Sequence, residues 1–488
     1  MQARLKALSL KGVLWSAGEG AGVALLSFAS FLVMARWLEP RDFGLAALAG
    51  VFVFFSNLVL GHVFTDALVQ RPDRAPVDRD TAHWASMAVA LALMGGCWAL
   101  APALGAWMGE PLLAPVLQAL SLCLPVGALA STPIAIARGD MRFAVVAKCS
   151  LAGRLAGAAT GVWMALAGWG VWSLVGQQLA SAAVGSLAVF VAVSWRPRLR
   201  FSWRSLGELA SYGFHVSASY VIGGAGEQVL NLLVGALFGT TALGYFAVAL
   251  RVMQLVRHLM SSAVYYVGLS AFARLKDDRV ALARAFLQST RMSCLAGFPV
   301  GIGLSVASVP LITVLSGPKW SASGPLLAIM ALEMVPGFYA LFTAALYRAV
   351  GHPGWTLAVA ALSTVLGLAG AAALAPYGLA AIVAFLALRT ALLVPIHAAL
   401  VRRLLPVDGR ALVEVAFAPG MAAIAMGLAV GAVAGLPEIG ALAPLPTLVV
   451  LGTVGAAVYL TATWLFSPGL VELAGRTLRA MLSPAKPS

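Results

Sequence analysis

Apolar stretches long enough to cross a lipid bilayer follow one another along almost the whole chain. A membrane helix needs about 20 apolar residues to span roughly 30 Å of hydrocarbon. Only 10% of the residues are charged and 61% are hydrophobic, whereas about a quarter of the residues of a soluble domain are charged. Because lipid offers no partner to backbone N–H and C=O groups, runs of this length must be helical. The chain is therefore predicted to be an all-α polytopic membrane protein.

Fourteen membrane helices are predicted from these runs. They cover residues 12–37, 43–66, 81–108, 112–136, 144–167, 169–194, 209–237, 244–268, 287–315, 322–347, 354–375, 378–400, 411–435 and 444–466. The basic N-terminus could belong to a signal peptide, but the run Gly12–Ala35 is longer than the apolar region of such a peptide, so we interpret it as the first helix. An even number of helices places both termini on one side of the membrane.

Basic residues are distributed unequally between the two sets of loops. On the side of the termini there are 24 Lys and Arg residues, whereas the opposite loops hold only Arg36, Arg41 and Lys319. Basic residues accumulate in the cytoplasmic loops of membrane proteins, so both termini are predicted to be cytoplasmic. Basic loops beside anionic headgroups also account for the net charge of +14 without a nucleic-acid partner.

A short pattern at residues 35–48 returns 200 positions later. In both places an apolar run ends, an elbow follows, and the next run begins near a glycine, Gly44 or Gly244. Residues 114–122 match 324–332 at an offset of 210. We therefore predict two parallel six-helix repeats, an arrangement found in many secondary transporters. The predicted parts are an N-terminal lobe at 1–195, a basic cytoplasmic linker at 196–208, a C-terminal lobe at 209–401, helices 13 and 14 at 402–467, and a cytoplasmic tail at 468–488.

Four segments carry a resemblance to a known family. They are Ala35-Arg-Trp-Leu-Glu-Pro-Arg-Asp-Phe-Gly44, Asp66–Arg71, Leu243–Arg251 and Ser316–Trp320. As a set they resemble Wzx-type polysaccharide or O-antigen flippases of the multidrug/oligosaccharidyl-lipid/polysaccharide exporter superfamily. The resemblance spans roughly the first 400 residues and leaves out the last two helices.

This resemblance implies a V-shaped pair of six-helix bundles around a central cavity lined by helices 1, 2, 7 and 8. It implies that a polyprenyl-pyrophosphate-linked oligosaccharide moves from the cytoplasmic to the periplasmic leaflet by alternating access, for O-antigen, capsule or exopolysaccharide synthesis. The implied location is the bacterial inner membrane. The implied partners are the lipid-linked glycan, membrane lipids and a polysaccharide polymerase complex. A final helix pair, where such folds have one, can border a groove for the lipid tail.

Eight charged residues form the predicted buried set of these helices, where a charge requires a partner or a wet cavity. They are Glu19, Arg154, Glu227, Arg251, Arg257, Arg291, Glu333 and Arg389. The arginines outnumber the glutamates. Arginine suits a pyrophosphate because its planar guanidinium binds phosphate oxygens in pairs and stays protonated.

Arg251, Gln254 and His258 share one face of predicted helix 8, since they are spaced i, i+3 and i+7. We predict that Arg251, with Arg257, contacts the pyrophosphate or the sugars, and that Gln254 and His258 belong to the same surface. In the alternative, Arg251 and Glu227 of helix 7 neutralise each other as a structural pair.

Two further arginines, Arg154 and Arg389, lie near the middle of helices 5 and 12, where ligand contact and inter-helix packing are both compatible with the sequence. Arg291 is expected to extend its side chain to the cytoplasmic interface.

Four residues are candidates for ion coupling or for lining the cavity. They are Glu19, Glu227, Asn231 and Glu333. Glu19 lies among small residues, so it suits either a proton or sodium site or a hydrogen-bonded helix contact. Asp66, at the end of helix 2, suits either a gate or a solvated surface.

No catalytic residue, cofactor or metal site is predicted. The sequence contains no Walker A motif, and its histidines have no metal-ligand spacing. The predicted external loops are too short for the catalytic loop of a membrane glycosyltransferase or polymerase, which disfavours those enzymes. A drug/cation antiporter of the same superfamily stays open as an alternative, although it requires carboxylates at the centre of its cavity.

Overall fold

The computed structural model describes residues 2–63, 65, 68 and 75–466. The contacts of the chain divide it into unit 1, Met1–Ala247, and unit 2, Val248–Ser488. The division falls inside one long helix rather than in the basic linker, so the repeat-based lobes at 1–195 and 209–401 stay a prediction. The predicted tail lies outside the described residues.

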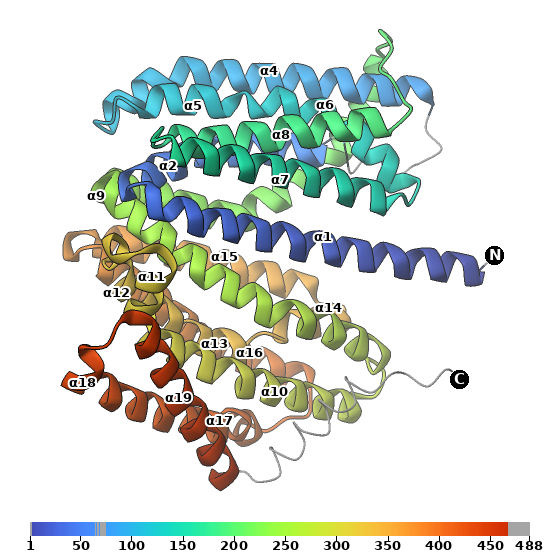
Figure 1. The fold of residues 1–488 in the computed structure, drawn as a ribbon. Coiled ribbons are helices and arrows are strands. Elements are labelled where there is room, and N and C mark those ends of the chain that lie inside the picture. The colour runs from blue at the N-terminus through green and yellow to red at the C-terminus, as the bar shows by residue number, and fades with distance from the viewer. Residues whose placement is uncertain (1, 64, 66–67, 69–74, 467–488) are drawn as a thin grey trace. The chain divides into compact units, whose positions relative to one another are not determined.

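Unit 1 is all-helical over its described residues (Figure 1). Its elements are α1 (Gln2–Trp37), α2 (Pro40–Val63), α4 (Pro76–Trp107), α5 (Leu113–Ser121), α6 (Cys123–Gly139), α7 (Phe143–Leu166), α8 (Trp172–Ala192) and the first part of α9 (Trp203–Arg274). Helix α8 packs on α6 and α7, and α1 runs along α7.

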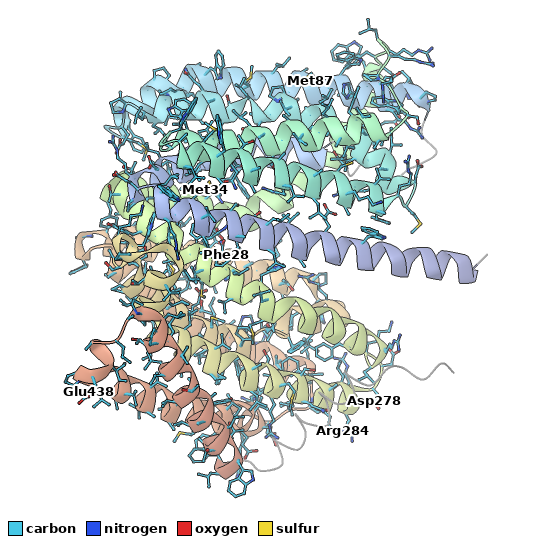
Figure 2. The ribbon with its side chains drawn as sticks, in the orientation of Figure 1. Phe28, Met34, Met87, Asp278, Arg284 and Glu438 are labelled. Carbon is cyan, nitrogen blue, oxygen red and sulfur yellow. The ribbon has the colours of Figure 1, made fainter. Side chains whose placement is uncertain are left out.

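Glycines on α7 let the helices of unit 1 approach closely. Gly153, Gly157 and Gly161 recur every four residues and face α8, where a Cβ would meet Gln177, Ser181 or Gly185 at less than 3.0 Å. Small residues at this spacing are how membrane helices gain packing contacts without a hydrophobic driving force. Met34 of α1, labelled in Figure 2, packs against the same stripe at Gly161.

Up to residue 466, where the described part of the chain ends, unit 2 contains the rest of α9 and ten further helices. These are α10 (Arg279–Val306), α11 (Ser308–Ser316), α12 (Ser323–Leu332), α13 (Met334–Tyr339), α14 (Thr343–Ala349), α15 (Pro353–Leu374), α16 (Leu379–Leu404), α17 (Gly409–Ala434), α18 (Pro437–Gly440) and α19 (Pro444–Phe466), with single 3-10 turns η1 (Pro318–Trp320) and η2 (Ala375–Tyr377). Asp278 caps α10 by accepting from the backbone N–H groups of Val280 and Ala281. Figure 2 shows Asp278 and Arg284 at one end of this unit and Glu438 at the opposite end.

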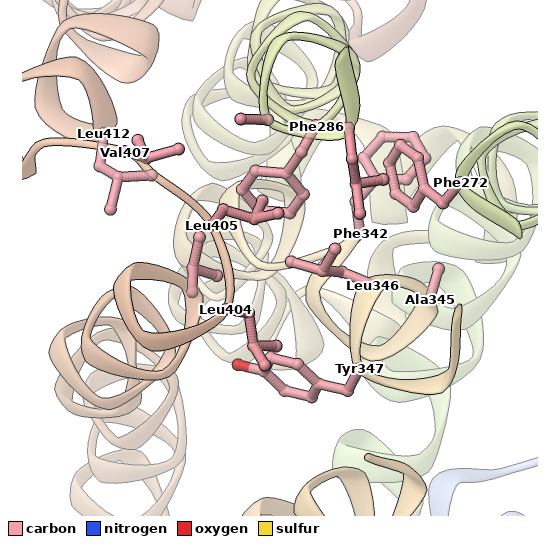
Figure 3. Close-up of a cluster of buried hydrophobic side chains, with 13 residues drawn as sticks. Phe272, Phe286, Phe342, Ala345, Leu346, Tyr347, Leu404, Leu405, Val407 and Leu412 are labelled. Carbon is pink, nitrogen blue, oxygen red and sulfur yellow. The ribbon is translucent and has the colours of Figure 1, made fainter. Parts of the chain in front are cut away.

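Two apolar clusters hold unit 2 together. In the first, the rings of Phe272, Phe286 and Phe342 meet from α9, α10 and the start of α14 (Figure 3). Leu404 and Leu412 extend it over the connection from α16 to α17. The second cluster joins α10 to α17 and α19, with Cys294, Phe298, Met426 and Tyr459 among its members. The last two long helices are therefore packed into unit 2.

Three predicted helices are interrupted. The predicted helix 112–136 is α5 and α6, 322–347 is α12 to α14, and 287–315 is α10 and α11, which bend by 75°. In each case a helix ends four residues before a proline: Ser121 before Pro125, Val306 before Pro310, and Leu332 before Pro336. Proline cannot donate to that carbonyl, and its ring crowds it.

The first predicted helix begins earlier than expected, because α1 includes the basic N-terminal residues from Gln2. Among the described residues, ten helices are long and apolar enough to cross a bilayer, or eleven if the bent pair α10–α11 counts as one span. The chain is thus an all-helical, multi-pass membrane protein. All four cysteines are buried and unpaired.

Candidate functional site

The two elbows found in the sequence cross each other within unit 1. A Cβ on Gly44 would overlap the backbone carbonyl of Thr240, and a Cβ on Gly244 would overlap the backbone carbonyl of Pro40. The contact is reciprocal. Gly44 and Gly244 are 200 positions apart, and so are the residues that they face, Pro40 and Thr240. Such a pattern is the mark of a two-fold contact between equivalent surfaces.

The second elbow is sharper than predicted. Gly239 is the single non-helical residue inside α9, with φ 81° and ψ 172°. Glycine accepts this positive φ at little cost, so the helix restarts at once at Thr240. The predicted gap at residues 238–243 is therefore reduced to one turn residue.

Glu110, in the connection between α4 and α5, links the two elbows. Its carboxylate accepts from the Arg41 guanidinium at 2.6 Å and from the Thr240 hydroxyl at 2.5 Å. Desolvation raises the pKa of the Glu110 carboxyl, but the hydrogen bonds from Arg41 and Thr240 and the charge of Arg41 outweigh it, so the pKa lies below its ordinary value. The carboxylate is thus held ionised between one residue of each elbow.

A second carboxylate fixes the start of α2. Asp42 accepts from the backbone N–H of Glu39 at 2.9 Å, which satisfies a donor at the helix start. The turn between α7 and α8 lies against it, since a Cβ on Gly170 would be 3.4 Å from an Asp42 oxygen. The first elbow is therefore supported by a third segment of unit 1.

In unit 2 the structure brings two predicted site residues together. The Arg389 guanidinium on α16 lies 3.8 Å from the carboxylate of Glu333, at the break between α12 and α13. The Thr390 hydroxyl donates to the same carboxylate at 3.1 Å, and Arg389 donates to the Ser363 carbonyl at 3.2 Å. A Cβ on Gly367 of α15 would overlap Arg389. The pair therefore joins three helices.

The other predicted residues are placed as follows. On α9, Arg251, Arg257 and His258 are exposed and Gln254 is half-buried. Arg154 on α7 and Glu227 on α9 are exposed, whereas Glu19 on α1 is half-buried. The Oδ1 atom of the half-buried Asn231 is buried and accepts no hydrogen bond. Arg291 is half-buried on α10. Asp66 lies outside the described residues.

Unit 2 also contains an apolar cavity of about 430 Å³. Val256 of α9 and Leu311 of α11 line it, together with residues of α10, α17 and α19 such as Leu304, Met426 and Leu451. Within the described part of the chain, no group of three or more His, Cys, Asp or Glu residues could hold a metal ion.

Sequence reasoning missed Glu110, Thr390, Ser363 and the role of Thr240. The available signal for Glu110 was an acidic residue in a predicted external loop, opposite Arg41 in the neighbouring loop. The Ser363 contact uses a backbone carbonyl, which no residue pattern reveals.

The fold is one that solved membrane transporters also have. The structure is similar to the lipid II flippase MurJ in an inward closed conformation, with a TM-score of 0.76 at 13% sequence identity over 94% of this chain and 100% of that one. It is also similar to an inward-facing MATE multidrug transporter of the MOP superfamily, with a TM-score of 0.61 at 16% identity over 80% of this chain and 96% of that one.

The sequence then identifies the family. Residues 33–325 match the model of the polysaccharide biosynthesis protein family, and the chain belongs to that family. The family match confirms the resemblance seen in the sequence.

Three relatives with named roles are also similar. The succinoglycan biosynthesis transport protein ExoT of Rhizobium meliloti is 27% identical over 66% of this chain and 65% of its own length. The lipopolysaccharide biosynthesis protein WzxC of Escherichia coli is 22% identical over 73% and 70%. The teichuronic acid biosynthesis protein TuaB of Bacillus subtilis is 21% identical over 66% and 67%. The alignment thus spans about two thirds of each relative.

Proposed function

We propose that this protein is a flippase that moves a polyprenyl-pyrophosphate-linked oligosaccharide from the cytoplasmic to the periplasmic leaflet by alternating access, for O-antigen, capsule or exopolysaccharide synthesis. The observation that carries the proposal is the match to a lipid II flippase over the whole of that chain. The structural match leaves out 6% of this chain, which is fewer residues than the segment Gly409–Phe466 contains. The structural similarity therefore includes part of the last helices. The relatives' roles in surface polysaccharide synthesis support a glycan as the cargo.

We further propose fourteen membrane spans with both termini in the cytoplasm of the bacterial cell, in two six-helix lobes with the predicted boundaries. Helices occupy each of the fourteen predicted stretches, some of them interrupted. The basic loops support the orientation. The reciprocal contact of the elbows supports a two-fold relation between the repeats.

For the substrate site we propose Arg251 and Arg257, with Gln254 and His258 on the same stretch of α9. Exposure of both arginines is compatible with a contact to a pyrophosphate, which a guanidinium binds through paired hydrogen bonds. Arg154, also exposed, is proposed as a further contact to the pyrophosphate or the sugars.

For coupling to a proton or a sodium ion we propose Glu333 with its partner Arg389, and Glu19, Glu227 and Asn231 as additional cavity residues. The contact between Glu333 and Arg389 supports this role, because loading the carboxylate with a proton or sodium would release the guanidinium toward substrate. The apolar cavity beside α17 and α19 supports a place for the lipid tail. A polysaccharide polymerase complex is the proposed partner.

The elbows are proposed to close the cavity on the periplasmic side. Their support is the backbone contact at Gly44 and Gly244 and the carboxylate of Glu110 between them. Opening toward the periplasm would then require this contact to separate.

The test is deletion of the gene, followed by complementation. We expect lipid-linked repeat units to accumulate in the cytoplasmic leaflet and surface polysaccharide to be lost. Wild type and the control Arg284→Ala should restore export, because Arg284 lies in the first turns of α10 outside the apolar run. Arg251→Ala should not. Normal export by Arg251→Ala would remove the site assignment alone, and normal polysaccharide in the deletion strain would remove the function.

A drug/cation antiporter is the second candidate, and the similarity to the MATE transporter favours it. It predicts increased drug sensitivity in the deletion strain with unchanged polysaccharide, the opposite of the outcome expected for a flippase.

A further inference from the structure

The segment that joins α8 to α9 is fixed by its backbone. The N–H of Arg198 donates to the buried Asp80 carboxylate at 3.2 Å, and the N–H of Ser202 donates to the buried Thr81 hydroxyl at 3.0 Å. The Trp84 indole donates to the Arg198 carbonyl at 2.9 Å. All three partners lie in the first turns of α4. On the side of the segment, these three hydrogen bonds use only backbone groups.

Most of the side chains from residue 198 to residue 204 are exposed. Leu199 is 90% exposed, Trp203 is 79% exposed and Phe201 is 46% exposed. Arg198, Arg200 and Arg204 alternate with them and are also exposed. We call these six residues the basic–aromatic strip. A run of exposed large apolar side chains indicates a surface that a lipid membrane or a binding partner covers.

Arg196 lies close to the strip in the sequence but is not part of it. Its guanidinium donates to the carbonyls of Phe190, Val193 and Trp195 at 2.8, 2.6 and 2.8 Å. It therefore satisfies carbonyls at the end of α8, which is a structural role. The arginines of the strip make no comparable backbone contacts among the described residues.

The strip lies at a membrane surface. It follows the end of α8 and rests on the beginning of α4, and both helices are long and apolar enough to span a bilayer. Figure 1 shows this connection at the end of unit 1 where α4 begins. At that depth Trp and Phe side chains meet the headgroup region, and arginines meet lipid phosphates.

We propose that the basic–aromatic strip is a binding site for anionic phospholipid headgroups of the bilayer in which the protein is embedded. The three arginines bind the phosphates, and Leu199, Phe201 and Trp203 insert among the upper parts of the lipid chains. The positive charge of the strip favours an anionic lipid over a neutral lipid. It also favours an anionic lipid over a protein surface with few acidic residues. The site is separate from the proposed substrate residues and does not depend on the proposed function.

The test uses the purified full chain in bilayer discs of phosphatidylcholine with a minor fraction of phosphatidylglycerol. The readout is the phosphatidylglycerol that the protein retains after extraction into detergent, measured by mass spectrometry. We expect enrichment by the wild type, and retention lower by roughly tenfold to a hundredfold in the variant Arg198→Gln/Arg200→Gln/Arg204→Gln. The variant Leu199→Ser/Trp203→Ser, which keeps every charge, should lose part of the enrichment.

The matched control is Arg402→Gln/Arg403→Gln/Arg410→Gln, which removes the same charge from exposed positions at the end of α16 and the start of α17. It also loses an i,i+4 pair, Arg410 with Glu414, like that of Arg204 with Glu208. The control should retain the lipid. Equal loss in both triple variants, full retention in the strip variant, or a co-purifying protein in place of the lipid would overturn the proposal. If the strip variant does not fold, Arg200→Gln alone should lower retention several-fold, and unchanged retention there would overturn it equally.

Discussion

Two arginine–glutamate contacts in this molecule lie in opposite surroundings. Arg41 and Glu110 meet in the connections between helices, where the arginine side chain is 49% exposed. Arg389 and Glu333 meet between helices of unit 2, where the side chains are 19% and 26% exposed. Arg41 can therefore exchange its partner for water, whereas the Glu110 side chain is only 15% exposed. The second pair has few alternatives, because charges among membrane helices depend on each other or on a wet cavity.

Different interactions therefore stabilise the two sites. At the elbows the backbone fit of Gly44 and Gly244 sets the geometry, and the ion pair adds specificity to it. In unit 2 the ion pair and the hydrogen bonds of Arg389 and Thr390 link the break between α12 and α13 with α15 and α16. The following predictions separate these two cases.

The largest effect is expected from breaking the pair in unit 2. Glu333→Ala leaves Arg389 without its carboxylate and should destabilise the protein by about 3 kcal/mol, the lower end for buried pairs because some exposure remains. Thermal unfolding in detergent measures it. The double variant Glu333→Gln/Arg389→Gln should recover much of the loss, and a double variant as damaging as the sum of both singles would rule out the coupling.

A smaller loss is expected at the elbows. Gly44→Ala and Gly244→Ala each place a methyl group against the backbone of the other elbow, and overpacking of this kind costs about 1–3 kcal/mol. Gly50→Ala is the control, since Gly50 lies on the same helix with open space around it. Unfolding midpoints of all three variants give the answer. Equal midpoints for Gly44→Ala and Gly50→Ala would refute the close crossing.

Loss of the bridging carboxylate should have a lesser effect. Glu110→Gln keeps an acceptor but removes its charge, so we expect a destabilisation of about 1 kcal/mol. Glu208→Gln, which affects only a surface i,i+4 pair with Arg204, should change stability by less than about 0.5 kcal/mol. If both variants unfold at the same temperature, the elbow contact does not depend on Glu110.

The contribution of Glu110 should also depend on pH. Because its pKa is lowered in the folded protein, the stabilisation is present above its ordinary value of 4.5 and is lost as the pH falls through the lowered pKa. The difference in unfolding temperature between wild type and Glu110→Gln should therefore be constant near neutral pH and shrink below pH 4.5. A difference that stays constant down to pH 3 would contradict the assignment.

The sequence predicted where helices lie much better than where they break. Prolines 125, 310 and 336 end helices four residues upstream. However, Pro102, Pro133, Pro299, Pro395 and Pro419 lie inside continuous helices. Each proline leaves the carbonyl four residues upstream without its N–H donor, and contacts with neighbouring helices determine whether the helix continues there. The positions of the prolines alone therefore cannot separate those that end a helix from those that lie inside one.

The repeat pattern found the two elbows but not their contact. Offset matching relates Gly44 to Gly244, yet only the fold shows that each glycine faces the backbone of the other elbow. Likewise, Glu333 and Arg389 were singled out as charges inside apolar runs, but the sequence did not indicate that they are partners. They lie on helices that are distant in the sequence, and no local pattern relates such residues. The roles of Arg251, Arg257 and Arg154 stay predictions.

The central claim is best tested by reconstituting the full chain into vesicles with a fluorescent polyprenyl-pyrophosphate-linked oligosaccharide. A glycosidase outside the vesicles then reports the fraction of substrate in the outer leaflet over time. We predict that wild type makes the inner pool accessible much faster than protein-free vesicles do. We also predict that Arg251→Ala abolishes the acceleration and that Arg284→Ala preserves it. Wild-type protein that leaves the inner pool protected, in vesicles where a cationic drug crosses readily, would contradict the central claim.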